Sequence, residues 1–344
     1  MQATEKNLRG HLSGILSVAI SSNGQRIVSG SLDRTVKVWD GATTECLHTL
    51  EGHPSAVWAL AISGQGTRIV SGDDYGIVCL WDANEGTCMR TIEVRDNSDG
   101  VPVTISADGQ TILAAGDGGV KMWDTESGAL VRVLQGNERR CVAIAASMDG
   151  SRVIVSQASS INVWDAKSGL LLRRLEGHME GVTCVAMSSD GLRVVTGSWD
   201  GDVKLWDPAT GACLQTLRHK APVVSVATSG EIIVSCSHER GAVMIWSSEG
   251  GQCLQPLSLE ERAAEVKCVA ISKDSSRIIG GSDLPHSAVG VWDVAARKPQ
   301  RAVAFAMALH ERLGAASLVR ELEPELIRAI GVMVLAPVWG VADT

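Results

Sequence analysis

The chain has 344 residues, 45% of them hydrophobic, which is enough for one large domain or two ordinary domains with a substantial core. Its formal net charge of −8 argues against direct nucleic-acid binding, because phosphate contacts require clustered lysine and arginine. Residues 1–10 lack the apolar segment of a secretory signal, and the longest uncharged run, 329–342, is shorter than the roughly 20 residues of a membrane-spanning helix. We therefore expect a cytoplasmic or nuclear protein without membrane insertion.

Tryptophan recurs at a fixed place along the chain, which has ten tryptophans but one tyrosine and one phenylalanine. Seven of them end an apolar pattern such as VKVWD at residues 36–40, and successive copies lie 40 to 46 residues apart. A period of this length indicates a repeat architecture. We call these residues the repeat tryptophans: Trp39, Trp81, Trp123, Trp164, Trp206, Trp246 and Trp292.

Each repeat predicts four short strands. In the first repeat, residues 10–21 form a loop and then alternate apolar and polar positions, which is typical of a half-buried strand. A turn and a second strand follow over 22–31, a tight turn and a third strand over 32–40, and a last turn and strand over 41–50. Strands this short cover their faces by stacking radially against neighbouring sheets. The fold class is therefore predicted to be all-β.

The Gly-His pair near the start of a repeat and the Trp-Asp pair at the end of its third strand resemble the WD40 repeat family. The resemblance implies a seven-bladed β-propeller around a central channel, which we expect over residues 1–299. Closing the ring needs an outer strand for the last blade. Residues 4–11 align with the outer strand of repeat one, whereas 298–305 compete for the same place; we favour the N-terminal strand.

The resemblance also implies a buried hydrogen-bonded set of histidine, serine or threonine, aspartate and tryptophan. Repeats one and five match fully, with His11, Ser31, Asp33 and Trp39 in one and His178, Ser198, Asp200 and Trp206 in the other. Repeat two has Asp73 and Tyr75 where the serine and aspartate are expected, so we expect its set to be incomplete. A His-Ser-Asp trio could suggest a catalytic triad, but copies that are partial and buried favour a structural role.

Other chemical sites find no support in the spacing of residues. Asp200, Gly201 and Asp202 lack the further oxygen ligands of a calcium loop, and the glycines at 116–119 are not followed by the Gly-Lys-Ser/Thr of a phosphate-binding loop. Nine cysteines form no Cys-x-x-Cys pair, and their odd number cannot close fully into disulfides. We therefore predict no catalytic residue, no metal and no cofactor, and we do not expect an enzyme.

The resemblance implies that partners bind the face carrying the loop before the first strand and the turn before the third. The large or charged residues at the family's contact positions are Leu32, Trp58, Asp74, Arg140, Trp199, His238, Glu265 and Lys267. Trp58 and Trp199 are outside the repeat-tryptophan positions. Each is a candidate anchor for a partner, since tryptophan is enriched at binding hot spots, or else packs against a neighbouring loop.

Composition changes after about Pro299, where alanine, leucine, glutamate and arginine predominate. Pro324 suits a first helical position, and apolar residues over 326–334 follow helical spacing, so we expect short helices over 300–344. The stretch LEPELIRAI at 322–330 resembles the opening of an F-box. The leading hypothesis is a non-catalytic scaffold, a monomer within a larger complex, that binds one or more proteins or peptides. The alternative is a substrate receptor of a ubiquitin ligase, recruited through residues 300–344.

Overall fold

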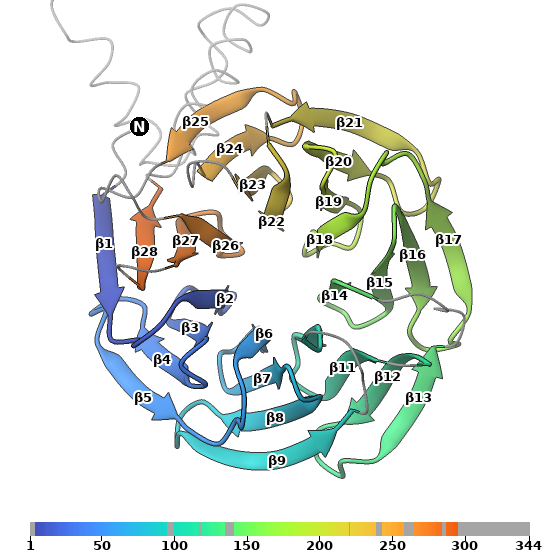
Figure 1. The fold of residues 1–344 in the computed structure, drawn as a ribbon. Helices are drawn as coiled ribbons and strands as arrows, with labels where there is room; N and C mark the ends of the chain where they lie inside the picture. The colour runs from blue at the N-terminus through green and yellow to red at the C-terminus, as the bar shows by residue number, and fades with distance from the viewer. Residues whose placement is uncertain are drawn as a thin grey trace, which may run out of the picture. The chain divides into compact units, whose positions relative to one another are not determined.

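The computed structural model describes residues 4–94, 100–116, 118–134, 141–219, 221–238, 243–257, 265–283 and 287–294. Every regular element in these ranges is a β-strand, and the strands form seven antiparallel sheets of four strands each. Figure 1 shows the sheets as the blades of a ring, with the first strand of each blade nearest the centre. The protein is therefore a seven-bladed β-propeller, as the repeats predict.

Six blades consist of four consecutive strands each, and the seventh combines the last three strands with the first strand. Blades 1 to 3 contain β2 (Ile15–Ile20), β3 (Arg26–Ser31), β4 (Val36–Asp40), β5 (Cys46–Leu50); β6 (Val57–Ile62), β7 (Arg68–Asp73), β8 (Ile77–Asp82), β9 (Thr87–Glu93); and β10 (Val103–Ile105), β11 (Thr111–Gly116), β12 (Gly119–Asp124), β13 (Leu130–Leu134). Blades 4 to 6 contain β14 (Ile144–Ala146), β15 (Arg152–Gln157), β16 (Ser160–Asp165), β17 (Leu171–Leu175); β18 (Val182–Met187), β19 (Val194–Ser198), β20 (Asp202–Trp206), β21 (Cys213–Arg218); and β22 (Val223–Thr228), β23 (Ile232–Ser237), β24 (Val243–Ser247), β25 (Cys253–Leu257). Blade 7 contains β26 (Val266–Ile271), β27 (Arg277–Ser282), β28 (Ala288–Asp293) and β1 (Thr4–Arg9).

The N-terminal strand closes the ring. β1 pairs antiparallel with β28 over its whole length, with Lys6 opposite Val291 and Arg9 opposite Ala288. Leu8 of β1 is buried in a cluster with Ile15 and Trp39 of blade 1, so the closing strand also contributes to the core between blades 7 and 1. The preference for the N-terminal strand is confirmed.

The hydrophobic core lies between successive blades. In one cluster, for example, Val38 and Leu50 of blade 1 pack with Val57, Ile69 and Trp81 of blade 2. Burying a large apolar side chain contributes about 1.5–3 kcal/mol, so each blade face depends on the next blade for its stability. This packing explains why the repeat tryptophans recur.

Polar contacts also join the outer strands of neighbouring blades. A side chain in the outer strand of one blade donates to a carbonyl in the last turn of the next; the bonds are Lys6 Nζ to Ala42, His48 Nε2 to Asn84, Arg90 Nη2 to Glu126, Arg132 Nη1 to Ser168, Arg173 Nε to Ala209 and Gln215 Nε2 to Glu249. Their lengths run from 2.8 to 3.4 Å. We call these contacts the rim bonds. They hold the blades in register and so fix the loops that connect them.

The C-terminal segment forms a separate unit. Contacts divide the chain into Met1–Val294 and Ala295–Thr344. The predicted helices over 300–344, the F-box-like stretch and the competing strand at 298–305 all lie outside the described residues, so the boundary at 299 and the ubiquitin-ligase alternative stay predictions. Within the described ranges, no helix has the length and apolar character needed to cross a membrane.

Candidate functional site

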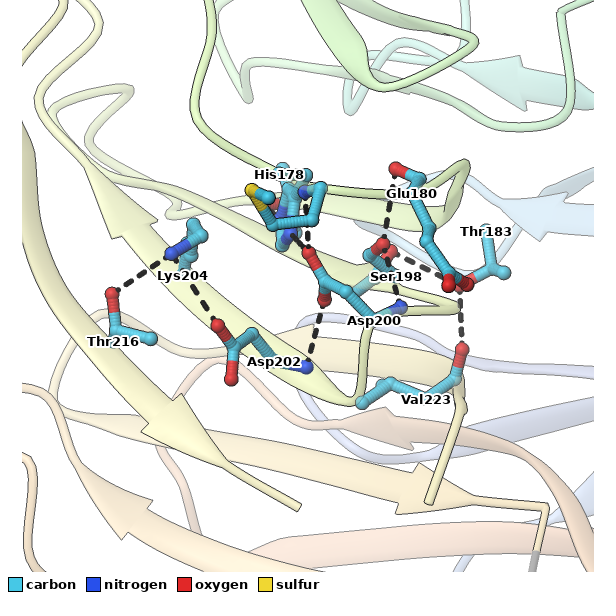
Figure 2. A network of polar contacts seen from close by, with 12 residues as sticks. His178, Glu180, Thr183, Ser198, Asp200, Asp202, Lys204, Thr216 and Val223 are labelled. Carbon is cyan, nitrogen blue, oxygen red and sulfur yellow. Dashed lines mark hydrogen bonds and ion pairs between the residues drawn. The ribbon is translucent and has the colours of Figure 1, made fainter. Parts of the chain in front are cut away.

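One face of the propeller carries the loops that enter each blade and the hairpins between its second and third strands. We call it the upper face; the turns at the other ends of the strands form the lower face. Both kinds of upper-face loop meet at the histidine network of a blade, because the histidine lies in the entering loop and the aspartate in or beside the hairpin. Blade 5 illustrates the arrangement (Figure 2).

In blade 5 a chain of hydrogen bonds runs from the hairpin to the core. His178 Nδ1 donates to Asp200 Oδ2 at 2.9 Å, and the Thr196 hydroxyl donates to His178 Nε2 at 2.7 Å. The indole N–H of Trp206 donates to the same Thr196 oxygen at 2.9 Å. Each buried polar group thus has a partner, as burial requires.

The sequence pattern predicts that Ser198 supplies the hydroxyl of this network. In the structure the hydroxyl belongs to Thr196. Ser198 Oγ instead donates to the carbonyl of Glu180 at 3.2 Å and accepts the backbone N–H of Asp200 at 3.2 Å (Figure 2). Residues two apart point to the same face of a strand, but Thr196 lies deeper, nearer the indole. Ser198 lies at the strand end and fastens the hairpin to the entering loop.

In blade 1, too, the hydroxyl of the network comes from a different residue than the sequence predicts. The hydroxyl that bonds His11 Nε2 at 2.8 Å and accepts the indole N–H of Trp39 at 2.9 Å belongs to Ser29. Ser31, predicted for this place, donates to the carbonyl of Ser13 at 3.0 Å. His11 Nδ1 lies 2.8 Å from Asp33 Oδ2, so the histidine, aspartate and tryptophan of the predicted set are in contact.

Blade 2 has a complete network, contrary to the expectation from its sequence. His53 Nδ1 donates to Asp73 Oδ2 at 3.0 Å, and His53 Nε2 and the indole N–H of Trp81 both bond the Ser71 hydroxyl, at 2.7 and 2.8 Å. Asp73 is fully buried at the end of its strand, two positions before the aspartate of blade 1. Its Oδ1 accepts the N–H of Tyr75, so one carboxylate serves both the histidine and the hairpin.

The remaining blades depart further from this pattern. In blade 6, His219 Nε2 bonds the Ser235 hydroxyl at 2.6 Å, and Trp246 donates to it at 2.7 Å. In blade 4, Val155 occupies the hydroxyl position, and among the residues that the structure describes the buried indole N–H of Trp164 has no hydrogen-bond partner. The partial copies fit a structural role for the network.

Electrostatics in the blade 5 network favour a neutral histidine beside a charged aspartate. Burial lowers the pKa of His178, although the carboxylate of Asp200 opposes this effect. Burial alone would raise the pKa of Asp200, but N–H donors from Asp202, Met179 and His178 outweigh it and hold that pKa below its usual value. Since the Thr196 hydroxyl is fully buried, it cannot meet a substrate as a nucleophile would.

The networks fix loops that present apolar side chains to solvent. The N–H of Met179 donates to Asp200 Oδ2 at 2.9 Å, and the N–H of Trp199 donates to the carbonyl of Gly181 at 3.0 Å. With their backbones tied down, both side chains face outward. We call six of the exposed large apolar residues of the upper face the upper apolar set: Leu12 (89% exposed), Leu32 (41%), Trp58 (43%), Tyr75 (70%), Met179 (88%) and Trp199 (51%).

The predicted contact residues fall into different environments. Leu32 and Trp199 lie at the tips of matching hairpins in blades 1 and 5. Trp58 is half exposed, but it also covers Gly100 at the entrance of blade 3, where an added Cβ would lie 2.7 Å from Trp58 Cγ. Packing on a neighbouring loop therefore accounts for part of Trp58, and the predicted anchor role is stronger for Trp199.

The charged candidates make contacts with their neighbours. Asp74 is half-buried and accepts the Ser55 hydroxyl at 3.1 Å. Lys267 Nζ donates to Glu265 Oε2 at 2.6 Å, and this hydrogen bond lowers the pKa of Glu265. His238 is exposed, and Arg140 lies outside the described residues.

Sequence reasoning missed three members of the upper apolar set: Leu12, Tyr75 and Met179. Leu12 and Met179 each follow directly after the histidine of the Gly-His pair. Because the aspartate of the network accepts their backbone N–H, the side chain must point away from the buried histidine. An apolar residue at this position is the signal that could have found them. Among the residues that the structure describes, no group of histidine, cysteine, aspartate or glutamate side chains could hold a metal ion.

Comparison with known proteins agrees with the repeat pattern. A family model described as "WD domain, G-beta repeat" matches residues 3–40, 44–82, 86–124 and 169–207. These four matches cover three consecutive repeats at the start of the chain and the repeat around Trp206.

Similar curated proteins share only short segments with the chain. The vegetative incompatibility protein HET-E-1 of Podospora anserina is 54% identical over 41 residues, 12% of this chain and 3% of that protein. The dynein assembly factor with WD repeat domains 1 of Xenopus laevis is 49% identical over 45 residues, 13% of this chain and 11% of that protein. The U3 small nucleolar RNA-associated protein 15 homolog of Gallus gallus is 34% identical over 91 residues, 26% of this chain and 17% of that protein. The chain thus spans less than a fifth of the length of each of these relatives.

Proposed function

The protein is a WD40-repeat β-propeller, and we propose that it is a non-catalytic scaffold that binds protein or peptide partners on its upper face. A fold of this kind hosts many functions, so the proposal rests on the surface and not on the fold alone. The observation that carries it is the upper apolar set. Five large apolar side chains are exposed on loops of the upper face, and Trp58 is exposed near the start of β6.

The rigidity of these loops supports binding at low entropic cost. Trp199 lies on a hairpin held by Ser198, Asp200 and Gly181, so little conformational freedom remains to be lost in a complex. Tryptophan and tyrosine offer large contact areas with few rotatable bonds. We expect Trp199 to insert into an apolar pocket of the partner.

The distribution of the set indicates where the partner lies. Blade 1 carries Leu12 and Leu32, the adjacent blade 2 carries Trp58 and Tyr75, and blade 5 carries Met179 and Trp199. Blade 5 lies across the ring from blades 1 and 2 (Figure 1). A partner that contacts both groups crosses the mouth of the central channel. An extended peptide or a protruding loop fits this geometry.

The names of the relatives support a role for this propeller within a larger protein assembly. Two of them are named for dynein assembly and for association with a small nucleolar RNA, and another is named for ribosome biogenesis. We propose accordingly that this propeller acts as one subunit of a complex, and that the nucleus is the first compartment in which to look for it.

The test compares Trp199→Ala with Leu171→Ala, which removes an exposed leucine from the outer strand β17. Partners recovered with the full chain are purified, and their affinity for each variant is measured by calorimetry beside its thermal unfolding. We expect Trp199→Ala to cost roughly 2 kcal/mol of binding with little change in stability, and Leu171→Ala to leave binding unchanged. A fall in melting temperature with unaltered affinity of the folded fraction would instead assign Trp199 to loop packing.

A further inference from the structure

The central channel ends at the lower face in a cavity that all seven blades surround. Its volume is about 180 Å³, and the first strand of each blade, nearest the centre in Figure 1, contributes to its wall. The last residues of these strands form what we call the channel ring: Ile20, Ile62, Ile105, Ala146, Met187, Thr228 and Ile271. All of them except Thr228 are apolar, so the ring can hold an apolar group.

A second layer of residues lines the cavity two positions beyond the channel ring. These residues belong to the turns between the first and second strands, and we call them the turn ring: Ser22, Gly64, Ala107, Met148, Ser189 and Lys273. Among the described residues that line the cavity, Lys273 is the only charged one. The mouth of the channel therefore combines an apolar ring with a single cation.

Lys273 is exposed and has no ion-pair partner within the described ranges. The carboxylate next to it in the sequence, Asp274, bonds groups of its own turn instead. Asp274 Oδ1 accepts the Ser272 hydroxyl at 2.6 Å, and the N–H and the hydroxyl of Ser276 at 3.0 and 2.8 Å. The ammonium group of Lys273 is therefore available to an anion in the cavity.

The corresponding aspartates of three other turns are held in the same way. Each accepts a serine hydroxyl of its own turn at 2.5 or 2.6 Å; they are Asp108, Asp149 and Asp190. Cations lie beside two of these turns, where Arg68 and Arg152 donate to backbone carbonyls at 2.9 and 3.1 Å. No described carboxylate lines the cavity, so the charge that a ligand contacts is that of Lys273.

The turn ring also offers backbone donors. In blades 1 and 2 its N–H groups donate to the turn of the following blade, from Ser22 to the Gly64 carbonyl at 3.0 Å and from Gly64 to the Ala107 carbonyl at 2.8 Å. In the part of the chain that the structure describes, four other N–H groups at this turn position donate to no acceptor; they belong to Ala107, Met148, Ser189 and Lys273. Backbone N–H groups and an ammonium group are the donors that a carboxylate accepts.

The size of the cavity suits a single side chain. A cavity of about 150 Å³ lined by aliphatic side chains holds one benzene molecule, and this cavity is slightly larger. Lys273 lies two residues beyond Ile271, which is roughly 7 Å along an extended chain, so a ligand must carry its anionic and apolar groups close together. A carboxylate and an apolar side chain occur on one residue only at the C-terminal end of a protein chain.

We propose that the lower mouth of the central channel binds the C-terminal residue of a partner protein whose last side chain is apolar. That side chain enters the channel ring, and the terminal carboxylate accepts hydrogen bonds from Lys273 Nζ and from N–H groups of the turn ring. Charge-assisted hydrogen bonds of this kind are about twice as strong as neutral ones. The site lies on the face opposite the upper apolar set, so it does not depend on the function proposed for that set.

The probe for the test is N-acetyl-leucine, titrated into the full chain by calorimetry and ligand-observed NMR. N-acetyl-leucine methylamide keeps the side chain without the carboxylate, and N-acetylglycine keeps the carboxylate without the side chain. We expect N-acetyl-leucine to bind with a Kd on the order of 1 mM and each control compound to bind at least about tenfold more weakly. Equal binding of N-acetyl-leucine and either control, or no binding of N-acetyl-leucine at roughly 50 mM, would overturn the proposal.

Matched variants locate the binding. Lys273→Gln is expected to weaken N-acetyl-leucine at least about tenfold. Lys167→Gln, which alters an exposed lysine in the last turn of blade 4, is expected to leave its affinity unchanged. Ala146→Phe fills the channel ring and is expected to abolish binding while the thermal unfolding stays cooperative. Unchanged affinity in Lys273→Gln or in folded Ala146→Phe would place the binding elsewhere and overturn the proposal.

A further compound separates the end of a partner chain from a free fatty acid. The anion 4-methylpentanoate has a branched apolar end and a carboxylate, but it has no peptide group. Comparable or weaker binding of 4-methylpentanoate supports a site for a protein C-terminus. Binding more than about tenfold tighter than that of N-acetyl-leucine would overturn the assignment to a partner protein.

Discussion

Val155 of blade 4 occupies the strand position that Thr196 holds in blade 5, and the buried indole N–H of Trp164 consequently has no acceptor within the described ranges. The two blades share the same pairing of second and third strands, with Val153 opposite Trp164 and Val194 opposite Trp206. One side chain therefore separates a satisfied tryptophan from an unsatisfied one. Unsatisfied buried donors cost about 1–3 kcal/mol, so the difference is large enough to measure.

Reciprocal substitutions test this relationship. Thr196→Val orphans both His178 Nε2 and the indole of Trp206, and we expect it to lower the free energy of unfolding by about 2–4 kcal/mol. Val155→Thr gives Trp164 an acceptor, and we expect a gain of about 1 kcal/mol. Urea unfolding at neutral pH measures both. Equal and opposite effects are not expected, because blade 4 gains one bond whereas blade 5 loses two.

The assignment of the blade 1 hydroxyl predicts a difference between two neighbouring serines. Ser29→Ala leaves His11 and Trp39 without their shared partner, and we expect a loss of about 2–4 kcal/mol. Ser31→Ala removes only the bonds to backbone groups at the strand end, with an expected loss of about 1 kcal/mol. Thermal and urea unfolding of the two variants provide the comparison. A larger loss for Ser31→Ala would contradict the network described for blade 1.

His219 predicts a dependence of stability on pH. Burial lowers its pKa from 6.5 to about 4, so the folded protein favours the neutral ring, whereas the unfolded chain binds a proton near its ordinary pKa. The contribution of His219 is therefore fully present above about pH 6.5 and decreases as pH falls towards 4. We expect this effect to lower the free energy of unfolding by about 2 kcal/mol when the pH falls from about 7.5 to about 5.

The control for this prediction is the difference between variants. His219→Gln removes the titrating group, and its stability should fall less over the same interval than that of the unaltered protein. Parallel profiles for His219→Gln and the unaltered protein would show that His219 does not carry the effect.

Thr44 predicts a stabilising substitution. Its φ is +67°, and it lies in the turn position where blades 2 to 6 have glycine: Gly86, Gly128, Gly169, Gly211 and Gly251. A β-branched residue is strained in this conformation, so we expect Thr44→Gly to raise the free energy of unfolding by about 1 kcal/mol.

The matched control is Gly128→Ala in blade 3. An added Cβ would lie 2.3 Å from Arg90 Nη1, whose side chain makes the rim bond to Glu126. The same φ strain and this collision should together cost about 1–3 kcal/mol. Melting temperatures of both variants give the signs, and a stabilising Gly128→Ala would contradict the packing of Arg90 over this turn.

The number of blades could be predicted because a buried tryptophan is needed once in each of them. The closing strand could be predicted as well, since residues 4–11 repeat the pattern that precedes His53. The hydroxyl of each network could not. Ser29 and Ser31 lie on the same face of β3, and only the pairing of Ile27 with Trp39 shows which serine is near the indole.

Asp73's place in its network and three members of the upper apolar set could not be predicted, for a related reason. Asp73 reaches its histidine from the strand and not from the hairpin, and a sequence pattern does not contain the path of a side chain. For Leu12 and Met179, outward orientation follows from a hydrogen bond to the aspartate of the network.

The pairing of β1 with β28 has a consequence for the synthesis of the protein. Arg9 and its partner Ala288 are separated by about 280 residues, so translation at about 5–20 residues per second leaves an interval on the order of 15 to 60 seconds between them. During that time β1 has no strand to pair with, and the face of blade 1 around Ile15 has no neighbour. The ring is therefore completed only after β28 has left the ribosome, and until then the edge of β1 and the apolar face of blade 1 stay exposed.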